Sequence, residues 1–375
     1  GDYLICWYLR GLPFVGREEW EIEHRHQTFN RLLQTLRAPD YPNVAFWVHD
    51  VRRRRGVDGR AAFRQPFNQS MSDAYFRVLS GQRMMVNELY LTMIYRPVLA
   101  TAKRFMEKSA NLDKLRSQQE QAVAKVMELA TNVEAVIKDY APYRLSMYEA
   151  PNGQVFSEAL EFYGFLLNRL EEPVPVLKAP VYDYLAVSRH MFSARSGDFV
   201  VVTPDGRSQF GAILNLKEYP DGTYPGILNG LKYLDFEYVI THSFTPMGRQ
   251  DALTVLDRTK GMMISSGDKS YTQIAELDHA MDQLASGNFV VGEYHFSMAV
   301  YADSQEALQK QIAIARAELS NAGFVTVKDD LAVASSFYAQ LPGNWKYRSR
   351  LANISSMNFL GLSPLHNFAM GKKDR

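Results

Sequence analysis

The sequence predicts an α+β fold built from two split βαβ units, an arrangement that is also called ferredoxin-like. Three observations support this prediction. Short runs of β-branched and aromatic residues alternate with longer amphipathic stretches, the order strand, helix, strand, strand, helix, strand occurs twice, and an insertion separates the two middle strands each time. An irregular C-terminal connecting segment, rich in Asn, Ser, Pro and aromatic residues, follows the second unit.

The first unit is expected over residues 1–172. β-Branched and aromatic residues predict its strands, and apolar residues spaced by three and four predict its helices, as with Val126, Leu129 and Val133. A basic insertion, residues 52–84, separates its middle strands and contains a short predicted helix. The predicted strands are 3–9, 43–51, 88–95 and 144–149, and the predicted helices are 18–37, 72–79, 112–140 and 157–170.

The second unit is expected over residues 173–341. Three prolines between residues 171 and 180 mark the boundary, because proline-rich stretches favour extended linkers. A helical insertion, residues 248–286, separates the middle strands of this unit. Its predicted strands are 199–203, 209–219, 238–244, 288–302 and 324–328, and a short helix is predicted at 227–234.

The strand predicted at 288–302 has a clear alternation. Tyr294, Phe296 and Met298 place apolar side chains on one face, whereas His295 and Ser297 point to the other. Strict alternation of this kind is typical of a strand with one buried face.

A helix is predicted directly after this strand. Asp303 and Glu306 have the spacing of a capping box at its start, and Gly323 is placed to end it. The expected buried face of the helix is formed by Leu308, Ile312, Ala315 and Leu319.

Composition limits the classes of function. The 375 residues carry a net charge of +1, which gives no overall attraction to nucleic acid or to anionic lipid. No apolar run reaches the roughly 18–20 residues that a membrane-spanning helix needs. The single cysteine, Cys6, excludes an intramolecular disulfide bond and fits a reducing compartment, and within its apolar strand we expect a buried, unreactive thiol.

A nucleotide-binding loop is the first catalytic motif to look for. A P-loop requires G-x-x-x-x-G-K-[ST] between a strand and a helix, so that backbone N–H groups surround the phosphates. Residues 261–270 come close, but their glycine spacing is one residue too long and Asp268 separates the second glycine from Lys269. We therefore expect a loop between two helices there, and no catalytic residue, cofactor site or metal site in this chain.

Four consecutive arginines, Arg52, Arg53, Arg54 and Arg55, form the main basic cluster. One interpretation is a solvated hairpin arm whose charges also protect a strand edge. The alternatives are contact with an acidic partner or anionic lipid, and contact with nucleic-acid phosphates. A run of charge does not by itself decide between these interpretations.

The C-terminal segment, residues 342–375, contains a second candidate interaction site. Trp345, Tyr347, Arg348 and Arg350 combine aromatic and guanidinium groups, as the anchors of protein interfaces do. The same side chains are equally suited to clamp the segment onto the last strand of their own chain. The segment ends in polar residues without a closing element, which suggests a connector toward a further domain.

Several stretches resemble one protein family. Those in the C-terminal segment are Leu341-Pro-Gly-Asn344 with the Arg-bearing aromatic residues after it, Ser355-Ser-Met-Asn358-Phe359, and Ser363-Pro-Leu-His-Asn-Phe368. The opening residues 1–14 and residues 284–296 also resemble parts of this family, so the similarity covers almost the whole chain. On these residues the chain resembles the N-terminal region of the conjugal-transfer and type IV secretion ATPases, the CagE/TrbE/VirB family.

The resemblance implies an assembly and docking module of a type IV secretion, or conjugation, ATPase. The whole protein would form a homo-oligomer, expected to be a hexamer, held peripherally at the cytoplasmic face of the bacterial inner membrane. Its partners would be a small inner-membrane channel component and other inner-membrane proteins of the secretion system. ATP and Mg would bind in a motor domain missing from this chain, where hydrolysis would drive assembly of the apparatus and transfer of DNA or protein.

Two other functions stay open at this point. Ferredoxin-like sheets can stack bases on exposed aromatic side chains, so the alternative is a nucleic-acid-binding module of a DNA-transfer machine. The balanced charge and the lack of an RNP-type motif make direct nucleic-acid binding the weaker reading. A self-contained enzyme would need a nucleotide site at residues 261–270, which the spacing there disfavours.

Overall fold

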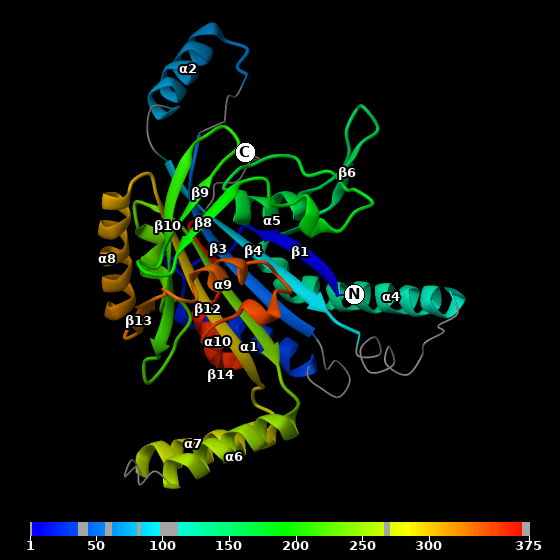
Figure 1. Cartoon of the computed structure of the whole chain (residues 1–375), viewed down its shortest axis with the longest axis vertical. Helices are drawn as coiled ribbons and strands as arrows, with labels where there is room; N and C mark the ends of the chain where they lie inside the picture. Colours follow the sequence, from blue (N-terminus) through cyan, green and yellow to red (C-terminus); the bar gives the residue numbers. More distant parts are fainter. Residues whose placement is uncertain are drawn as a thin grey trace.

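One large antiparallel sheet with helices on both faces organises the chain (Figure 1). The computed structural model describes residues 2–36, 44–56, 62–80, 84–97, 112–265 and 271–369. Within these residues the sheet has eleven strands, and all of its pairings are antiparallel. The mixture of helices with a sheet confirms the predicted α+β class.

The first half of the chain supplies four strands to this sheet. They are β1 (Tyr3–Leu9), β3 (Val44–Arg55), β4 (Met84–Tyr95) and β5 (Pro142–Arg144). Helix α1 (Glu19–Thr35) lies between β1 and β3 in the chain, α2 (Pro66–Ser80) between β3 and β4, and α4 (Leu112–Ile137) between β4 and β5. In the sheet the order is β5-β1-β4-β3.

The strand predicted at 144–149 is wrong as a single element. β5 ends at Arg144 and pairs with β1. The chain then leaves the large sheet, and β6 (Met147–Glu149) pairs with β7 (Val155–Ser157) in a separate hairpin. Helix α5 (Glu158–Asn168) starts directly after it, because the Ser157 hydroxyl accepts a hydrogen bond from Leu160 N.

The second half supplies the other seven strands. They are β8 (Arg189–Ser193), β9 (Asp198–Val202), β10 (Ser208–Glu218), β11 (Glu237–Pro246), β12 (Val291–Ala302), β13 (Val325–Lys328) and β14 (Ala352–Ser355). Four of them lie in the order β13-β10-β12-β11, and β14 pairs with β12. β13 pairs with the C-terminal part of β10, whereas β9 pairs with its N-terminal part and β8 pairs with β9. The short helix predicted at 227–234 is a 3-10 helix, η3 (Asn229–Tyr233).

The two halves meet at β3 and β11. Val48 lies opposite His242, and Val51 lies opposite Val239, so these strands pair along their length. The strands of the two predicted units therefore form one continuous sheet, with β3 and β11 at its centre.

Side chains from β3 show how both faces of the sheet are buried. Phe46 and Val48 join a core with α1, α4 and α8 (Gln305–Asn321) on one face. Trp47 and His49 point to the opposite face, as alternation along a strand requires. That face is covered by α5 and α9 (Val333–Tyr338), with Phe337 in the second core. A strand buried on both sides needs apolar residues at most positions, which explains the weak alternation in β3.

Helix α8 follows the prediction except at its start. Its predicted inner face, Leu308, Ile312, Ala315 and Leu319, is buried. The helix is capped by Ser304, whose hydroxyl accepts from Ala307 N at 3.2 Å, so the capping box predicted at Asp303 is wrong by one residue. Gly323 ends the helix with a φ of +86°, as predicted.

The C-terminal segment passes from one face of the sheet to the other. It contains short elements that the sequence did not predict: η4 (Trp345–Tyr347), β14, α10 (Ser356–Leu362) and β15 (His366–Asn367). Trp345 packs against Trp47 on one face, whereas Phe359 stacks on Phe244 at 4.6 Å on the other. β15 finally pairs with β2 (Leu12–Pro13) near the N-terminus.

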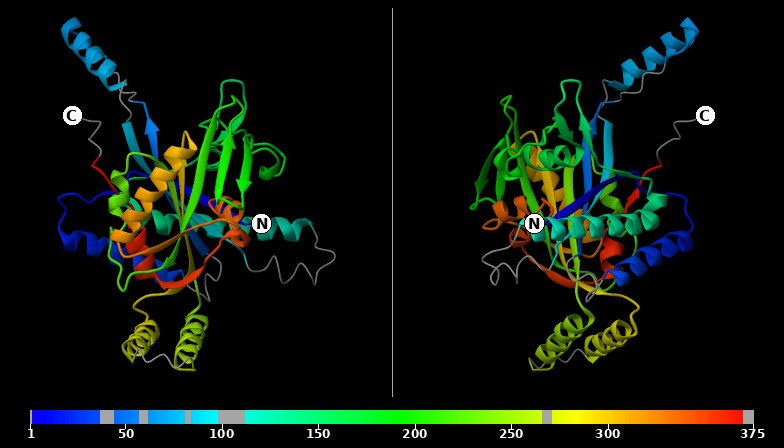
Figure 2. Two further views of the ribbon diagram at one scale, coloured as in Figure 1. Left: turned by 60° about the vertical axis from the view of Figure 1, so that its left-hand side comes forward. Right: turned by 90° about the vertical axis from the view of Figure 1, so that its right-hand side faces the viewer.

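The two insertions project from opposite ends of the molecule (Figures 1 and 2). One carries α2, and the other is a hairpin of α6 (Arg249–Ser265) and α7 (Tyr271–Ser286). The first is shorter than the predicted 52–84, because β3 extends through Arg55 and β4 begins at Met84. No helix among the residues that the structure describes combines the length and the apolar character needed to cross a membrane.

Candidate functional site

The arginine run is part of the sheet. Residues 52–55 continue β3 and pair with β4, and the side chains of Arg52 and Arg53 are buried. Arg52 donates from Nη1 to Asn87 Oδ1 at 2.9 Å, and Arg54 forms an ion pair with Asp303 at 3.3 Å. The solvated hairpin arm is therefore wrong for Arg52 and Arg53, because burial forces each guanidinium to find partners inside the protein.

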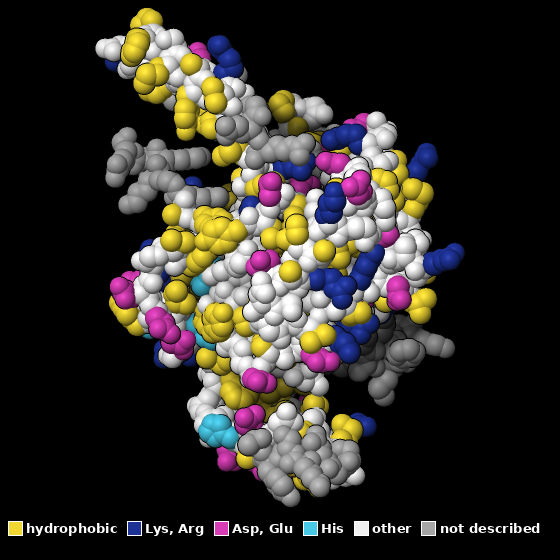
Figure 3. Space-filling model, turned by 90° about the vertical axis from the view of Figure 1, so that its left-hand side faces the viewer, with side chains coloured by type: hydrophobic (Ala, Val, Ile, Leu, Met, Phe, Trp, Pro, Cys, Tyr) yellow, Lys and Arg dark blue, Asp and Glu magenta, His cyan; other side chains and the backbone are white. Residues whose placement is uncertain are grey.

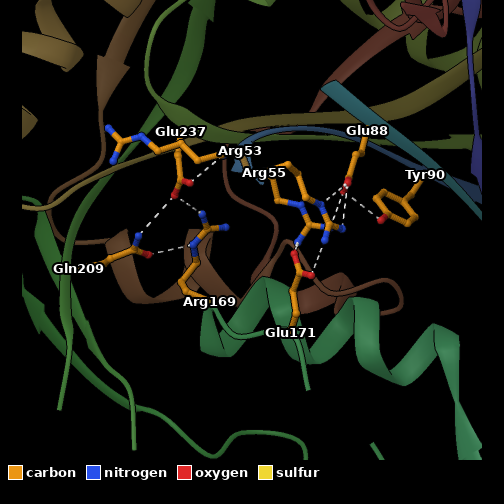
Figure 4. Close-up of polar contacts among 9 residues, drawn as sticks. Arg53, Arg55, Glu88, Tyr90, Arg169, Glu171, Gln209 and Glu237 are labelled. Atoms are coloured by element: carbon orange, nitrogen blue, oxygen red, sulfur yellow. Dashed lines mark hydrogen bonds and ion pairs between the residues drawn. The ribbon is translucent and has the colours of Figure 1, made fainter. Parts of the chain in front are cut away.

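Glu88 on β4 holds two of the arginines (Figure 4). Its carboxylate lies 2.5 Å from Arg53 Nη2 and 3.0 Å from Arg55 Nη2, and its side chain is only 9% exposed. Tyr90 donates its hydroxyl to the same carboxylate at 3.2 Å. Burial and the neighbouring Glu88 raise the pKa of Tyr90 well above its usual value, so this hydroxyl stays a donor.

Glu171, just after α5, closes the network from the solvent side. It forms ion pairs with Arg53 and, at 2.5 Å, with Arg55. Burial lowers the pKa of Arg55, but Glu88 and Glu171 outweigh this effect and the pKa is raised overall. The pair of arginines is thus matched by a pair of carboxylates from β4 and from the loop after α5.

A further arginine with a buried side chain, Arg169, lies beside this network. It ends α5 with a φ of +56°, and its guanidinium lies 4.5 Å from the Phe165 ring centre and 3.9 Å from the Tyr301 ring centre. It donates to Glu237 at 3.0 Å. Burial raises the pKa of Glu237, but Arg169, Arg54 and Gln209 together outweigh burial and lower the pKa overall, so the carboxylate stays ionised. The guanidinium fixes the end of α5 onto β11.

The network borders a surface cavity of about 300 Å³. Its lining includes the aromatic rings of Tyr90, Phe162 and Phe165 together with the two arginines. The remaining charged residues of the lining are glutamates: Glu158, Glu161, Glu171 and Glu172. Because four carboxylates face two arginines, and Glu88 neutralises part of the arginine charge, the cavity suits a positively charged side chain.

The aromatic residues of the C-terminal segment lie against the sheet. The indole of Trp345 packs edge-to-face on Trp47, with ring centres 4.8 Å apart. The guanidinium of Arg96 stacks over Trp345 at 4.6 Å, and Asp2 accepts from the indole Nε1 at 3.3 Å. Trp345 is therefore held by β3, by the end of β4 and by the N-terminus at once.

Arg348 is the most deeply placed charge of the segment. Its side chain is 4% exposed, and it forms an ion pair with Glu293 on β12 and donates to Ser243 Oγ on β11 at 3.2 Å. Its guanidinium also lies over the rings of Trp345 and Trp47. Burial lowers the pKa of Arg348, and Glu293 opposes this effect.

One backbone carbonyl within the segment, and one just before it, accept hydrogen bonds from buried histidines of the sheet. His49 Nε2 donates to Gln340 O, and His295 Nδ1 donates to Ser349 O, both at 2.7 Å. Burial lowers the pKa of each of these imidazoles to about 4. Neutral imidazoles can fill these positions because each needs only one N–H donor for its carbonyl.

The two remaining predicted anchors lie nearer the surface. Tyr347 is half-buried beside Tyr338, with ring centres 6.0 Å apart. Arg350 has an exposed guanidinium 3.5 Å from Asp329. The structure thus brings Trp345 and Arg348 together as a clamp within the chain and leaves Arg350 accessible.

Comparison with known proteins places this geometry in a family. Residues 143–350, which run from β5 to the end of the clamp, match the model of the CagE, TrbE, VirB family, described as a component of type IV transporter system. The chain belongs to this family. Residues 1–103 also match the model described as the N-terminal domain of type IV secretion system ATPase VirB4/TrbE.

Individual relatives of the CagE, TrbE, VirB family match across the whole chain. A type IV secretion system protein virB4 of Brucella suis is 37% identical over 382 residues, covering 100% of this chain and 45% of the relative. PtlC of Bordetella pertussis is 35% identical with the same coverage. A virB4 of Bartonella henselae is 30% identical, over 97% of this chain and 46% of the relative. The chain spans less than half the length of these relatives.

The segment that came close to a P-loop lies in the α6–α7 hairpin of this family member. α6 runs through Gly261 to Ser265, and α7 begins at Tyr271, so a helix precedes the segment as predicted. Residues 266–270 lie outside the described residues. A phosphate loop directly follows a strand, whereas the described residues directly before this segment form helix α6.

Sequence reasoning missed the carboxylates that complete both clusters. Glu88, Glu171 and Glu293 each lie far along the chain from the arginines that they bind. For Glu293 the sequence did contain a signal. The alternation in β12 places Glu293 on the face opposite Tyr294, which is the face that the C-terminal segment covers. Cys6, by contrast, is buried as predicted, and burial raises the pKa of its thiol to about 12.

Proposed function

We propose that this chain is the scaffold part of a type IV secretion ATPase, where it acts as an assembly and docking module. Relatives named virB4 and PtlC match it from end to end while being about twice as long. ATP hydrolysis, with ATP and Mg as cofactors, belongs in this proposal to the remainder of the whole protein. That hydrolysis powers assembly of the apparatus and the transfer of DNA or protein.

The observation that carries the proposal is the clamping of the C-terminal segment. Trp345 and Arg348 bind it to one face of the sheet, and Phe359 packs on the other face. A motor domain connected through residues 342–375 would pull on both faces of the sheet at once. The segment then transmits movement between the motor and whatever docks on the scaffold.

We further propose that each half is a split βαβ unit, with residues 1–172 and 173–341 as the two units and 342–375 as the connector. The strand orders β5-β1-β4-β3 and β13-β10-β12-β11 support this assignment. Numbered along the chain, the fourth strand of each unit pairs with the first, and the third strand lies between the first and the second.

The partners in this proposal are proteins of the secretion apparatus. The whole protein is a homo-oligomer, with a hexamer as the expected state, held peripherally at the cytoplasmic face of the bacterial inner membrane. It contacts a small inner-membrane channel component and other inner-membrane proteins. The cavity beside Glu171 and Glu172 is suited to a basic segment of such a partner.

A nucleic-acid-binding role has less support. Arg52 and Arg53 are buried, and Arg53 and Arg55 are matched by Glu88 and Glu171. Phosphate binding needs arginines whose charge is free to neutralise phosphates, and these guanidinium groups already have carboxylate or amide partners.

The experiment uses the whole protein with Arg348→Ala. We expect transfer of secretion substrate to fall by about tenfold, whereas ATP hydrolysis per molecule stays close to wild type, because the motor is intact but poorly coupled. Retained hydrolysis shows that the variant is folded. The matched control is Arg207→Ala, which removes an exposed ion pair with Asp205 at a hairpin turn. The proposal is contradicted if the Arg348→Ala protein transfers substrate as well as the wild type. It is also contradicted if hydrolysis and transfer fall together.

A further inference from the structure

Helix α2 carries an apolar stripe that is exposed in the part of the chain that the structure describes. Phe67, Met71, Tyr75 and Val78 are spaced by four, four and three residues, which places them along one side of the helix. Their exposed fractions are 72%, 62%, 62% and 66%, and no residue of α2 is buried. Four large apolar side chains in one exposed row are typical of an interaction surface.

The position of α2 leaves this stripe free. The helix stands at one end of the long axis of the molecule, beyond the ends of β3 and β4 (Figures 1 and 2). Figure 3 shows its apolar side chains on a projection that stands clear of the sheet and its covering helices. The projection of α2 and its lack of buried residues leave the stripe open to a partner.

The charges around α2 indicate what kind of partner fits. Residues 56–83 contain four arginines and two aspartates, a formal charge of +2. Residues 249–286, at the opposite end of the molecule, contain four basic and six acidic residues, a formal charge of −2. The two insertions thus carry opposite formal charges, so an anionic surface attracts the insertion with α2 and repels the insertion with α6 and α7.

Individual side chains agree with this polarity. Arg64 precedes α2 and Arg77 lies in its last turn, and within the described residues neither forms an ion pair. Asp73, the acidic residue of the helix, lies two positions from both Met71 and Tyr75, on the opposite side. Its carboxylate accepts a hydrogen bond from Gln69 at 3.0 Å, so it is turned away from the stripe.

We propose that α2 is an interfacial anchor that lies flat on an anionic lipid bilayer. Phe67, Met71, Tyr75 and Val78 enter the boundary between headgroups and acyl chains. Arg64 before the helix, and the long side chain of Arg77 from the side of the helix, reach lipid phosphates. The helix has 15 residues, so it is about 22 Å long and too short to span a hydrocarbon core of about 30 Å. The anchor rests on the proposed function in one respect, because it names the surface that holds the protein peripherally at the membrane. The observations that support the anchor are the exposed stripe and the charges around α2.

The test is co-sedimentation of the purified chain with vesicles. We compare vesicles of phosphatidylglycerol and phosphatidylcholine in equal parts with vesicles of phosphatidylcholine alone. The chain is expected to bind the anionic vesicles and to be released by added salt, because part of the attraction is electrostatic. Phe67→Ser with Tyr75→Ser is expected to weaken binding by at least about tenfold, because two apolar side chains no longer leave water.

The matched control is Tyr182→Ser, which removes a tyrosine that is 81% exposed and lies outside α2. It should bind vesicles like the wild type. Because α2 buries no residue, the double variant should also keep the wild-type unfolding transition, which is measured in parallel.

A second measurement follows the helix directly. With Tyr75→Trp, tryptophan emission should move to shorter wavelength when anionic vesicles are added, because the indole leaves water. The proposal is overturned if the wild-type chain does not bind anionic vesicles, or if the double variant binds them as well as the wild type does. Loss of self-association in the double variant, without vesicle binding by the wild type, would assign the stripe to a second copy instead. None of these results affects the connector proposal, which the hydrolysis and transfer measurements test.

Discussion

Arg348 forms an ion pair with Glu293 that ties the C-terminal segment to the middle of the sheet. The arginine side chain is 4% exposed and the glutamate 34%, so the pair is buried on the arginine side and open on the other. Arg348 also reaches Ser243 on β11 and the ring of Trp47 on β3. One guanidinium therefore connects three neighbouring strands to the segment that follows them.

Removing this guanidinium should destabilise the chain. We expect Arg348→Ala to lower the free energy of unfolding by about 2–3 kcal/mol. This is at or just below the lower end of the range for broken buried ion pairs, because Glu293 keeps some contact with water. Urea unfolding followed by circular dichroism measures the change. Arg207→Ala, which removes an exposed pair, should change it by less than about 1 kcal/mol. Equal effects of the two substitutions would show that the clamp adds no stability.

The two carboxylates beside Arg53 should differ in their importance. Glu88 is 9% exposed and Glu171 is 48% exposed, so only the first holds a charge that water cannot replace. We expect Glu88→Gln to cost about 3 kcal/mol of stability, and Glu171→Gln to cost less than about 1 kcal/mol. Urea unfolding of both variants checks the order, and a larger loss from Glu171→Gln would contradict it.

Stability should fall as the solution becomes acidic. Burial lowers the pKa of His49 and His295 to about 4 and that of His242 to about 3, from a usual value of 6.5. The unfolded chain therefore binds protons below pH 6.5 that the folded chain does not, so stability is lost from pH 6.5 down to each folded pKa. The shifts of His49 and His295 each correspond to about 3 kcal/mol, and that of His242 to about 5 kcal/mol.

The measurement is urea unfolding at several pH values between about pH 7 and pH 5. His49→Gln supplies a neutral side chain that can still donate to Gln340 O, so it should reduce the slope of stability against pH. An unchanged slope would mean that His49 takes up its proton in the folded chain.

Cys6 should be unreactive until the chain unfolds. Its thiol is buried next to Thr92, and its pKa is raised to about 12, so almost none of it is thiolate at neutral pH. We expect iodoacetamide to label it only in denaturant, as measured by mass spectrometry. Rapid labelling of the native chain would show that β1 opens readily.

Local patterns were enough to predict several elements. The buried row of α8 from Leu308 to Leu319 and the alternation in β12 both follow from side chains within one element. The same local patterns gave the α+β class. They could not show that His295 and Ser297 are buried as well, because the cover on that face comes from the C-terminal segment, about fifty residues further along the chain.

The candidate site depended on contacts between distant residues. Four consecutive arginines read as a solvated arm because the carboxylates that pair with them, Glu88 and Glu171, are 35 and 118 positions from Arg53. The C-terminal anchors were recognised as anchors, but their partners Trp47 and Glu293 lie on strands whose positions depend on the whole sheet. Composition alone carries no information on such pairings.

The central claim is that the C-terminal segment is a fixed part of the scaffold. Hydrogen–deuterium exchange of the whole protein tests it most directly, at the amides of β14 and of Ser356, which donates to Val290 O at 2.7 Å. We expect these amides to exchange as slowly as those of β3 and β11, both with and without ATP. Exchange at the rate of unprotected amides, in either state, would contradict it.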